Sequence, residues 1–223
     1  MLAHHRFQRV QRKFAVTQAG RVDVPWRGPE RRSGSMGQRD RFDGEFDTVL
    51  AGARAGEPWA FERIFTTLSP VVEGYLRVQG AAEPEDLVSE VFVAVLRNLP
   101  AFDGGESGFR SWVFTIAHRR MVDERRRAGR RPAAVDLAEA PDVAAPDDVA
   151  LAVEDALGDE RVRALCDRLS PDQRDVLVLR LLGRLTVDEI AAVLGRSPGS
   201  VKALQRRGFL AVARLIERES VPL

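Results

Sequence analysis

The sequence predicts an all-α fold made of two small helical domains. Apolar residues recur three and four positions apart through most of the chain, and no stretch alternates apolar and polar residues as a half-buried strand does. Breaks containing glycine and proline separate the helical segments. The 223 residues, 44% of them hydrophobic, suffice for one ordinary domain or two small ones. The predicted divisions are an arm at 1–41, a first domain at 42–128, a linker at 129–150 and a second domain at 151–223.

The N-terminal arm shows no sustained periodicity and is rich in glycine, proline, serine and arginine. This composition predicts disorder. The arm carries ten basic residues against three acidic ones. One hypothesis is that it touches nucleic acid, and another is that translation starts at Met36.

Two or three amphipathic helices are expected between Glu45 and residue 78, with a break at 56–58. The next helix is expected to start at Pro84 and to run to about residue 98, because proline is tolerated in a first helical turn. It has a wide apolar stripe, and Asp86 and Glu90 lie one turn apart on another face. That acidic pair is typical of a solvated surface or of a site for a basic partner.

A loop with three glycines, residues 100–108, leads into a helix that is expected to end near Arg127. One face of this helix carries its predicted core residues, Phe109, Trp112, Val113 and Ile116. A second face carries Arg110, Phe114 and His118. Between residues 119 and 131 there are seven arginines against two acids, which favours contact with a polyanion over simple solvation.

The linker contains prolines, alanines and acids and is expected to be extended, with a helix resuming near residue 147 and running to about 169. Nine acids and no base lie between 133 and 160. This part of the chain is expected to avoid a polyanion or to imitate one.

Several residues in the C-terminal domain predict where its helices begin and end. Ser170 and Pro171 have the residue types of an N-cap and a first helical position. Thr186 and Glu189 have the spacing of a capping box, and Gly195 stands where a short helix should stop.

A new helix is expected to restart at Ser197-Pro198, directly after the short helix at 187–194. Two short helices joined by a tight glycine turn predict a helix-turn-helix. The second helix is basic and has no acid before Glu217, which favours DNA binding over a plain helical hairpin.

Little in the sequence points to an enzyme. The lone Cys166 excludes an intramolecular disulfide and a cysteine-based zinc site. The three histidines have no metal-ligand spacing with acids, no nucleophile motif is present, and the glycine clusters match no phosphate-binding loop. We therefore expect no catalytic residue, metal or cofactor. With no apolar run near the roughly 18 residues of a membrane span and no signal peptide, a cytoplasmic protein without membrane insertion is expected.

These residues together resemble the bacterial RNA polymerase sigma factors of the extracytoplasmic-function (ECF) type, over roughly residues 45–218. The stretch 84–92, Pro-Glu-Asp-Leu-Val-Ser-Glu-Val-Phe, is similar to region 2.2 of that family. The stretch 109–117 with the arginines after it resembles regions 2.3 and 2.4, and 169–215 resembles region 4. The chain departs from the family at Ser89, where the family often has glutamine, and in the run 203–207, where it often has Arg-Leu-His-Arg-Ala. The N-terminal arm has no counterpart in the family.

The resemblance implies an initiation factor that binds core RNA polymerase, directs it to −35 and −10 promoter elements and helps to melt the −10 region. It implies that the clamp of the largest polymerase subunit is contacted by Asp86, Leu87, Glu90 and Val91. The −10 contacts would come from Phe102, Asp103, Glu106, Ser107, Arg110, Trp112, Arg119, Arg120 and Arg126. The −35 contacts would come from Arg196, Ser197, Ser200, Lys202, Ala203, Gln205, Arg206 and Arg207. An anti-sigma factor is a further partner in many members of the family.

Alternatives remain open at this point. A stand-alone helix-turn-helix regulator would use only residues 170–215 and would bind duplex DNA without polymerase. A helical scaffold that binds only protein would leave the basic faces unexplained. Trp112 itself has two interpretations, stacking on a melted base or packing in the core.

Overall fold

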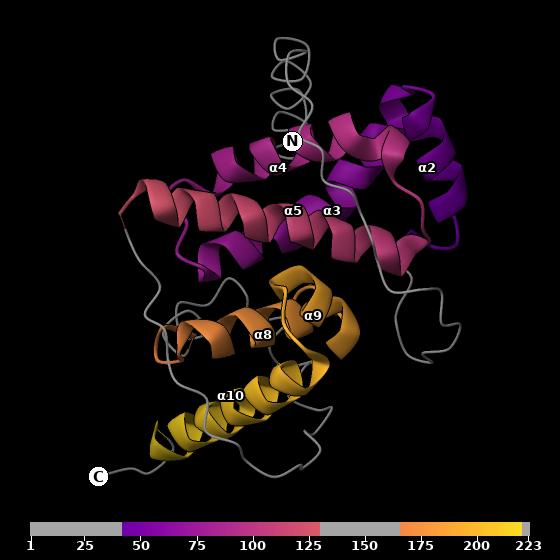
Figure 1. Ribbon diagram of the computed structural model, residues 1–223. Helices are drawn as coiled ribbons and strands as arrows, with labels where there is room; N and C mark the ends of the chain where they lie inside the picture. The colour runs from indigo at the N-terminus through magenta and orange to yellow at the C-terminus, as the bar shows by residue number, and fades with distance from the viewer. Residues whose placement is uncertain (1–41, 130–165, 220–223) are drawn as a thin grey trace.

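The computed structural model describes residues 42–129 and 166–219, and every regular element in these two ranges is helical (Figure 1). The predicted all-α class is confirmed for this part of the chain. The predicted arm, the linker beyond residue 129 and most of the helix expected at 147–169 lie outside the described residues.

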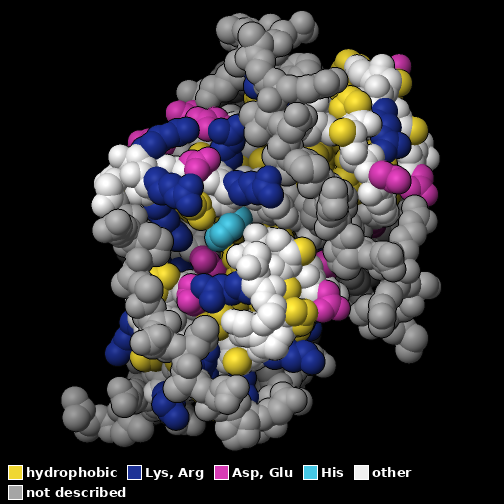
Figure 2. Space-filling model, viewed as in Figure 1, with side chains coloured by type: hydrophobic (Ala, Val, Ile, Leu, Met, Phe, Trp, Pro, Cys, Tyr) yellow, Lys and Arg dark blue, Asp and Glu magenta, His cyan; other side chains and the backbone are white. Residues whose placement is uncertain are grey.

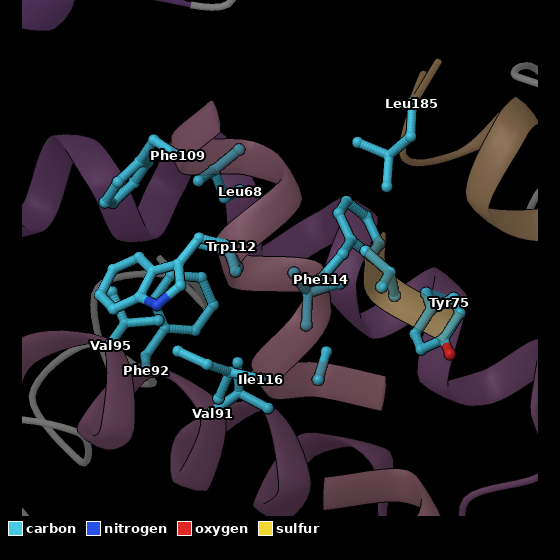
Figure 3. Close-up of a cluster of buried hydrophobic side chains, with 14 of the residues drawn as sticks. Leu68, Tyr75, Val91, Phe92, Val95, Phe109, Trp112, Phe114, Ile116 and Leu185 are labelled. Carbon is cyan, nitrogen blue, oxygen red and sulfur yellow. The ribbon is translucent and has the colours of Figure 1, made fainter. Parts of the chain in front are cut away.

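The first domain consists of helices α2 (Phe46–Arg54), α3 (Pro58–Val78), α4 (Pro84–Asn98) and α5 (Glu106–Arg127), with the short 3₁₀ helix η1 (Leu99–Ala101) after α4. Pro58 and Pro84 occupy first-turn positions, as expected from the sequence. Helices α3, α4 and α5 pack against one another, and α2 packs on α3. The core of this domain is aromatic around the first half of α5, where Trp112 packs against Phe102 and Phe109 (Figure 3 shows Trp112 and Phe109).

The second domain consists of α8 (Pro171–Leu181), α9 (Val187–Leu194) and α10 (Pro198–Glu219), which all contact one another. The Thr186 hydroxyl accepts from the Glu189 backbone N–H at 3.3 Å, and the Glu189 carboxylate accepts from the Thr186 N–H at 2.7 Å. Gly195 ends α9 in the left-handed region at φ 64°. The predicted capping box and stop are therefore confirmed, and α9 and α10 form the expected helix-turn-helix.

The two domains are in direct contact. Helix α9 packs against α5, and α8 packs against α3, so that the second domain lies under the first in Figure 1. Apolar side chains from both belong to one continuous buried cluster. The sequence predicted the two domains but not this contact between them.

Candidate polymerase and nucleic-acid interfaces

The N-terminal half of α4 combines a buried apolar side with a partly exposed acidic side. Leu87 and Val91 are buried in the core, whereas Asp86 and Glu90 are partly exposed. The Glu90 carboxylate lies 4.0 Å from the Arg120 guanidinium of α5. An exposed pair at this distance is weak, so Glu90 can exchange it for a basic partner at small cost.

The loop between α4 and α5 is built over the ring of Phe102. This ring is buried and stacks on Trp112 with ring centroids 5.1 Å apart. A Cβ at Gly104 would lie 2.9 Å from the Phe102 ring, so only glycine allows the loop to pass so closely. Asp103 of the loop and Ser107 of the first turn of α5 are therefore exposed to solvent, while the ring of Phe102 points inward.

The first half of α5 lies within the core. All nine residues from Phe109 to Ala117 are buried. Arg110 is 3% exposed and Trp112 is 1% exposed, so in this conformation neither can touch a DNA strand. Of the two interpretations of Trp112, the structure shows core packing, because its ring packs against Phe102 and Phe109.

The second half of α5 is the basic surface. Arg119 and Arg126 are exposed and Arg120 is partly exposed. Figure 2 shows Lys and Arg side chains gathered on the left of the upper domain, where α5 ends in Figure 1. Arg125 differs from these, because it turns inward and donates to the Gln79 side-chain oxygen at 2.6 Å and to the Gln79 backbone carbonyl at 2.9 Å.

The N-terminal part of α10 displays a polar surface. Ser197 and Lys202 are exposed, and the Ser197 hydroxyl accepts from the Ser200 N–H at 3.2 Å, which caps the helix. The other predicted −35 residues of this helix, Ala203, Gln205, Arg206 and Arg207, are partly exposed. Arg196, in the turn before α10, is held by Asp172 of α8 at 2.6 Å.

The comparisons with known proteins match both halves of the chain. The family model of Sigma-70 region 2 matches residues 64–131, and that of Sigma-70, region 4 matches residues 159–212. The chain belongs to the ECF RNA polymerase sigma factors.

Several relatives of similar sequence carry that name. BldN of Streptomyces coelicolor is 35% identical over 174 residues, which cover 75% of this chain and 64% of BldN. ShbA of Streptomyces griseus is 36% identical over 140 residues, covering 60% of this chain and 72% of ShbA. SigD of Mycobacterium tuberculosis is 31% identical over 172 residues, covering 73% of this chain and 80% of SigD.

A solved structure of CnrH in complex with the cytosolic domain of CnrY has a TM-score of 0.55 and 25% identity, and it covers 78% of this chain and 97% of CnrH. Family and fold together identify this sigma factor as a transcription initiation factor that works with RNA polymerase, and they favour this function over that of a stand-alone regulator. Among the helices in the described ranges, none is long and apolar enough to cross a membrane.

The structure brings together one group of polar residues that the sequence did not predict to be neighbours. Tyr75, Gln79, His118 and Arg125 of the first domain surround Asp175 of α8 in the second. The Tyr75 hydroxyl and His118 Nδ1 are 2.9 Å apart. The sequence gives no sign that Asp175 is buried or paired, because acidic residues are common on the exposed side of a helix such as α8.

Proposed function

We propose that this sigma factor divides its work among three surfaces. The acidic side of α4 contacts core polymerase, the α4–α5 loop and the second half of α5 contact the −10 element, and the start of α10 contacts the −35 element. The observation that carries the proposal is the exposure of polar and charged side chains on all three surfaces, each above a buried apolar support.

On α4, Asp86 and Glu90 offer carboxylates to basic side chains of the polymerase clamp. Charges of this kind orient a partner and raise its association rate more than they raise affinity. Leu87 and Val91 are buried in the free protein, so their role is to fix the helix from which the carboxylates project.

At the −10 element, opening requires bases that are unstacked and held as a single strand. Asp103 on the loop and Glu106 and Ser107 in the first turn of α5 can hydrogen-bond a base edge. Three arginines in the second half of α5 can neutralise strand phosphates. Arg119 and Arg126 are exposed, and Arg120 is partly exposed.

The three buried residues of the predicted −10 set act from beneath this surface. Phe102 and Trp112 support the loop by ring stacking, and Arg110 is enclosed in α5. Their contribution to DNA binding is therefore the shape of the loop and of the helix.

At the −35 element, α10 enters the major groove with its N-terminal residues on base edges. Ser200 and Gln205 are suited to base edges, whereas Lys202, Arg206 and Arg207 are suited to phosphates. Substituting Lys202 with alanine should lower affinity about equally for all sequences and reduce the salt slope by about one.

The proposal extends to the setting of the protein. We place it in the cytoplasm, with no catalytic residue and no cofactor of its own, as a partner of core polymerase and promoter DNA. The complex of CnrH with the cytosolic domain of CnrY supports a further protein partner, for which the family suggests an anti-sigma factor.

The experiment is transcription by purified core polymerase over fragmented genomic DNA of the source, with and without this protein. New start sites that share −35 and −10 elements are expected. A double variant, Asp86→Lys with Glu90→Lys, should lose polymerase binding and transcription, whereas Glu57→Lys, a single charge reversal of the same kind at an exposed site before α3, should keep both. Duplex binding without any polymerase binding would support the stand-alone regulator instead.

A further inference from the structure

The α4–α5 loop has little in its own sequence to fix its shape. Between η1 and α5 it consists of the four residues 102–105, and the last two are glycines. Glycine has the widest range of backbone conformations, so a short loop that ends in two glycines is flexible by composition. A polar group on such a loop discriminates between bases only when the backbone is held in the binding conformation. Contacts from outside the loop must therefore fix its shape.

Three of these contacts come from the elements on either side of the loop. The Phe102 N–H donates to the Leu99 carbonyl at 3.1 Å, and the Phe109 N–H donates to the Gly105 carbonyl at 2.9 Å. The Phe102 ring packs on Trp112 and Phe109, with ring centroids 5.1 and 5.2 Å apart. None of these three contacts involves the Phe102 carbonyl, from which the exposed part of the loop continues.

Arg54 holds that carbonyl from a different helix. Its guanidinium donates through Nη2 to the Phe102 carbonyl, across 48 positions of sequence. Arg54 is the last residue of α2, and α2 contacts η1 just before the loop. The hydrogen bond is partly buried and its donor is charged, and charge-assisted bonds are roughly twice as strong as neutral ones. Arg54 therefore fixes the peptide group between Phe102 and Asp103, which is the first residue that the loop exposes.

Helix α2 is a rigid support for this arginine. Its Val49, Leu50 and Ala53 are buried, and its Phe46 ring lies 5.5 Å from the Phe109 ring under the loop. Figure 1 shows α2 on the right of the first domain, beside the start of α5. One end of α2 thus contacts the aromatic support of the loop, and the other end contacts the loop backbone.

From the sequence alone, Arg54 has an ordinary explanation. A basic residue in the last turn of a helix is stabilised by the helix dipole and by solvent. Arg54 also lies before residues 64–131, which the Sigma-70 region 2 model matches. The observation that goes beyond this explanation is its hydrogen bond to the backbone of a loop in another part of the domain.

We propose that Arg54 is a positioning residue for reading of the −10 element, which holds the loop in the conformation that presents Asp103 to an unstacked base. This role rests on the proposed function, in which Asp103 hydrogen-bonds a base edge. Arg54 acts through the loop and touches no DNA itself. Its loss releases the loop backbone but leaves the Phe102 ring packed, so the protein stays folded and reads the −10 bases less strictly.

The test compares Arg54→Ala with Arg63→Ala in the full chain. Arg63 of α3 is the matched control, because it is an arginine of the same domain that pairs with Asp43 at 2.9 Å and not with the loop. Transcription by core polymerase is measured from a promoter found in the genomic experiment above and from derivatives with single −10 or −35 substitutions. Amide hydrogen exchange of residues 99–108 reports opening of the loop in the free protein. Urea unfolding checks the stability of each variant.

In Arg54→Ala, amide exchange in the loop should be severalfold faster. The preference for the original −10 bases should fall about 5-fold or more, because a well-placed pair of hydrogen bonds to a base edge discriminates by at least that factor. The preference for the original −35 bases should not change, and Arg63→Ala should match the wild type in every measurement. Arg54→Lys keeps the charge and one donor but not the planar fork, so it should recover part of the −10 preference.

Unchanged exchange in Arg54→Ala would overturn the positioning role, and so would faster exchange with an unchanged −10 preference. Loss of the −10 and −35 preferences together would indicate a general structural role and would overturn it as well. An equal loss of transcription from all −10 derivatives, with the salt slope lowered by about one, would make Arg54 a phosphate contact instead. A wild type without any −10 preference would overturn the proposed function, while the exchange data would still show whether Arg54 holds the loop.

Discussion

Replacing Trp112 with alanine should destabilise the protein far more than an exposed DNA-contacting residue would allow. The side chain is 1% exposed and stacks on Phe102 at 5.1 Å between centroids, with Phe109 at 5.6 Å. Truncation of a buried tryptophan costs about 3–5 kcal/mol, and each ring pair adds about 0.5–1.5 kcal/mol beyond its buried area. We expect the free energy of unfolding to fall by about 4 kcal/mol.

Trp59 provides the matched control, because it is the same residue type at 50% exposure. It lies over Gly52, whose Cβ position would be 2.8 Å from its ring. With about half of its area already in water, Trp59→Ala should cost about 2 kcal/mol or less. Because both variants replace tryptophan with alanine, the difference between their losses of unfolding free energy reports the effect of burial.

The assay is urea unfolding monitored by circular dichroism. The m-value, which is the slope of the unfolding free energy against urea concentration, is compared among the variants. A loss near 4 kcal/mol corresponds to a fall in Tm on the order of 10–20 °C. Equal and small losses for Trp112→Ala and Trp59→Ala would refute the reasoning. Trp112→Phe, which keeps a ring in the core, should retain promoter melting, and its failure to melt DNA while stable would restore a stacking role.

Three further predictions concern the second domain. Thr186→Ala removes the hydroxyl that caps α9 and should cost about 1 kcal/mol in urea unfolding, whereas a loss near zero would contradict the capping role. Gly195→Ala forces alanine to φ 64° and should cost about 1 kcal/mol, with a rise in stability as the contrary result. In Asp175→Asn only His118 titrates in the cluster near neutral pH. Since burial lowers the pKa of His118 below 6.5 in the folded protein, its proton binds better in the unfolded state. The free energy of unfolding of Asp175→Asn in urea should therefore fall as pH drops below about 6.5, and a constant value down to pH 5.5 would contradict this sign.

The helices were predictable from the sequence because their ends depend on neighbouring residues. Helix α4 starts at Pro84 and ends at Asn98, and α9 occupies 187–194 between Thr186 and Gly195, all as expected. Proline at a first turn, a capping box and a left-handed glycine each act within four residues. No knowledge of the rest of the molecule is needed to read such signals.

The contact between the domains could not be predicted in this way. Phe114 and His118 share a face of α5 to which the sequence assigned no role, and their partners lie about 60 residues away in sequence, beyond residues 130–165. Nothing local distinguishes Asp175 as the residue that will face His118. Only the packing of α9 on α5 brings them together, and this is a property of two domains rather than of one segment.

The same packing explains why the first half of α5 is buried on all sides. The stretch 109–117 is largely apolar, and the first domain covers one side of it while the second domain covers another. Arg110 is buried within this stretch, and the arginines at the surface begin at Arg119. Phe114 depends on the second domain for its cover, whereas Trp112 packs against Phe102 and Phe109 of its own domain. The face of α5 that the second domain covers is therefore centred on Phe114 and His118, beside the proposed DNA-contacting arginines.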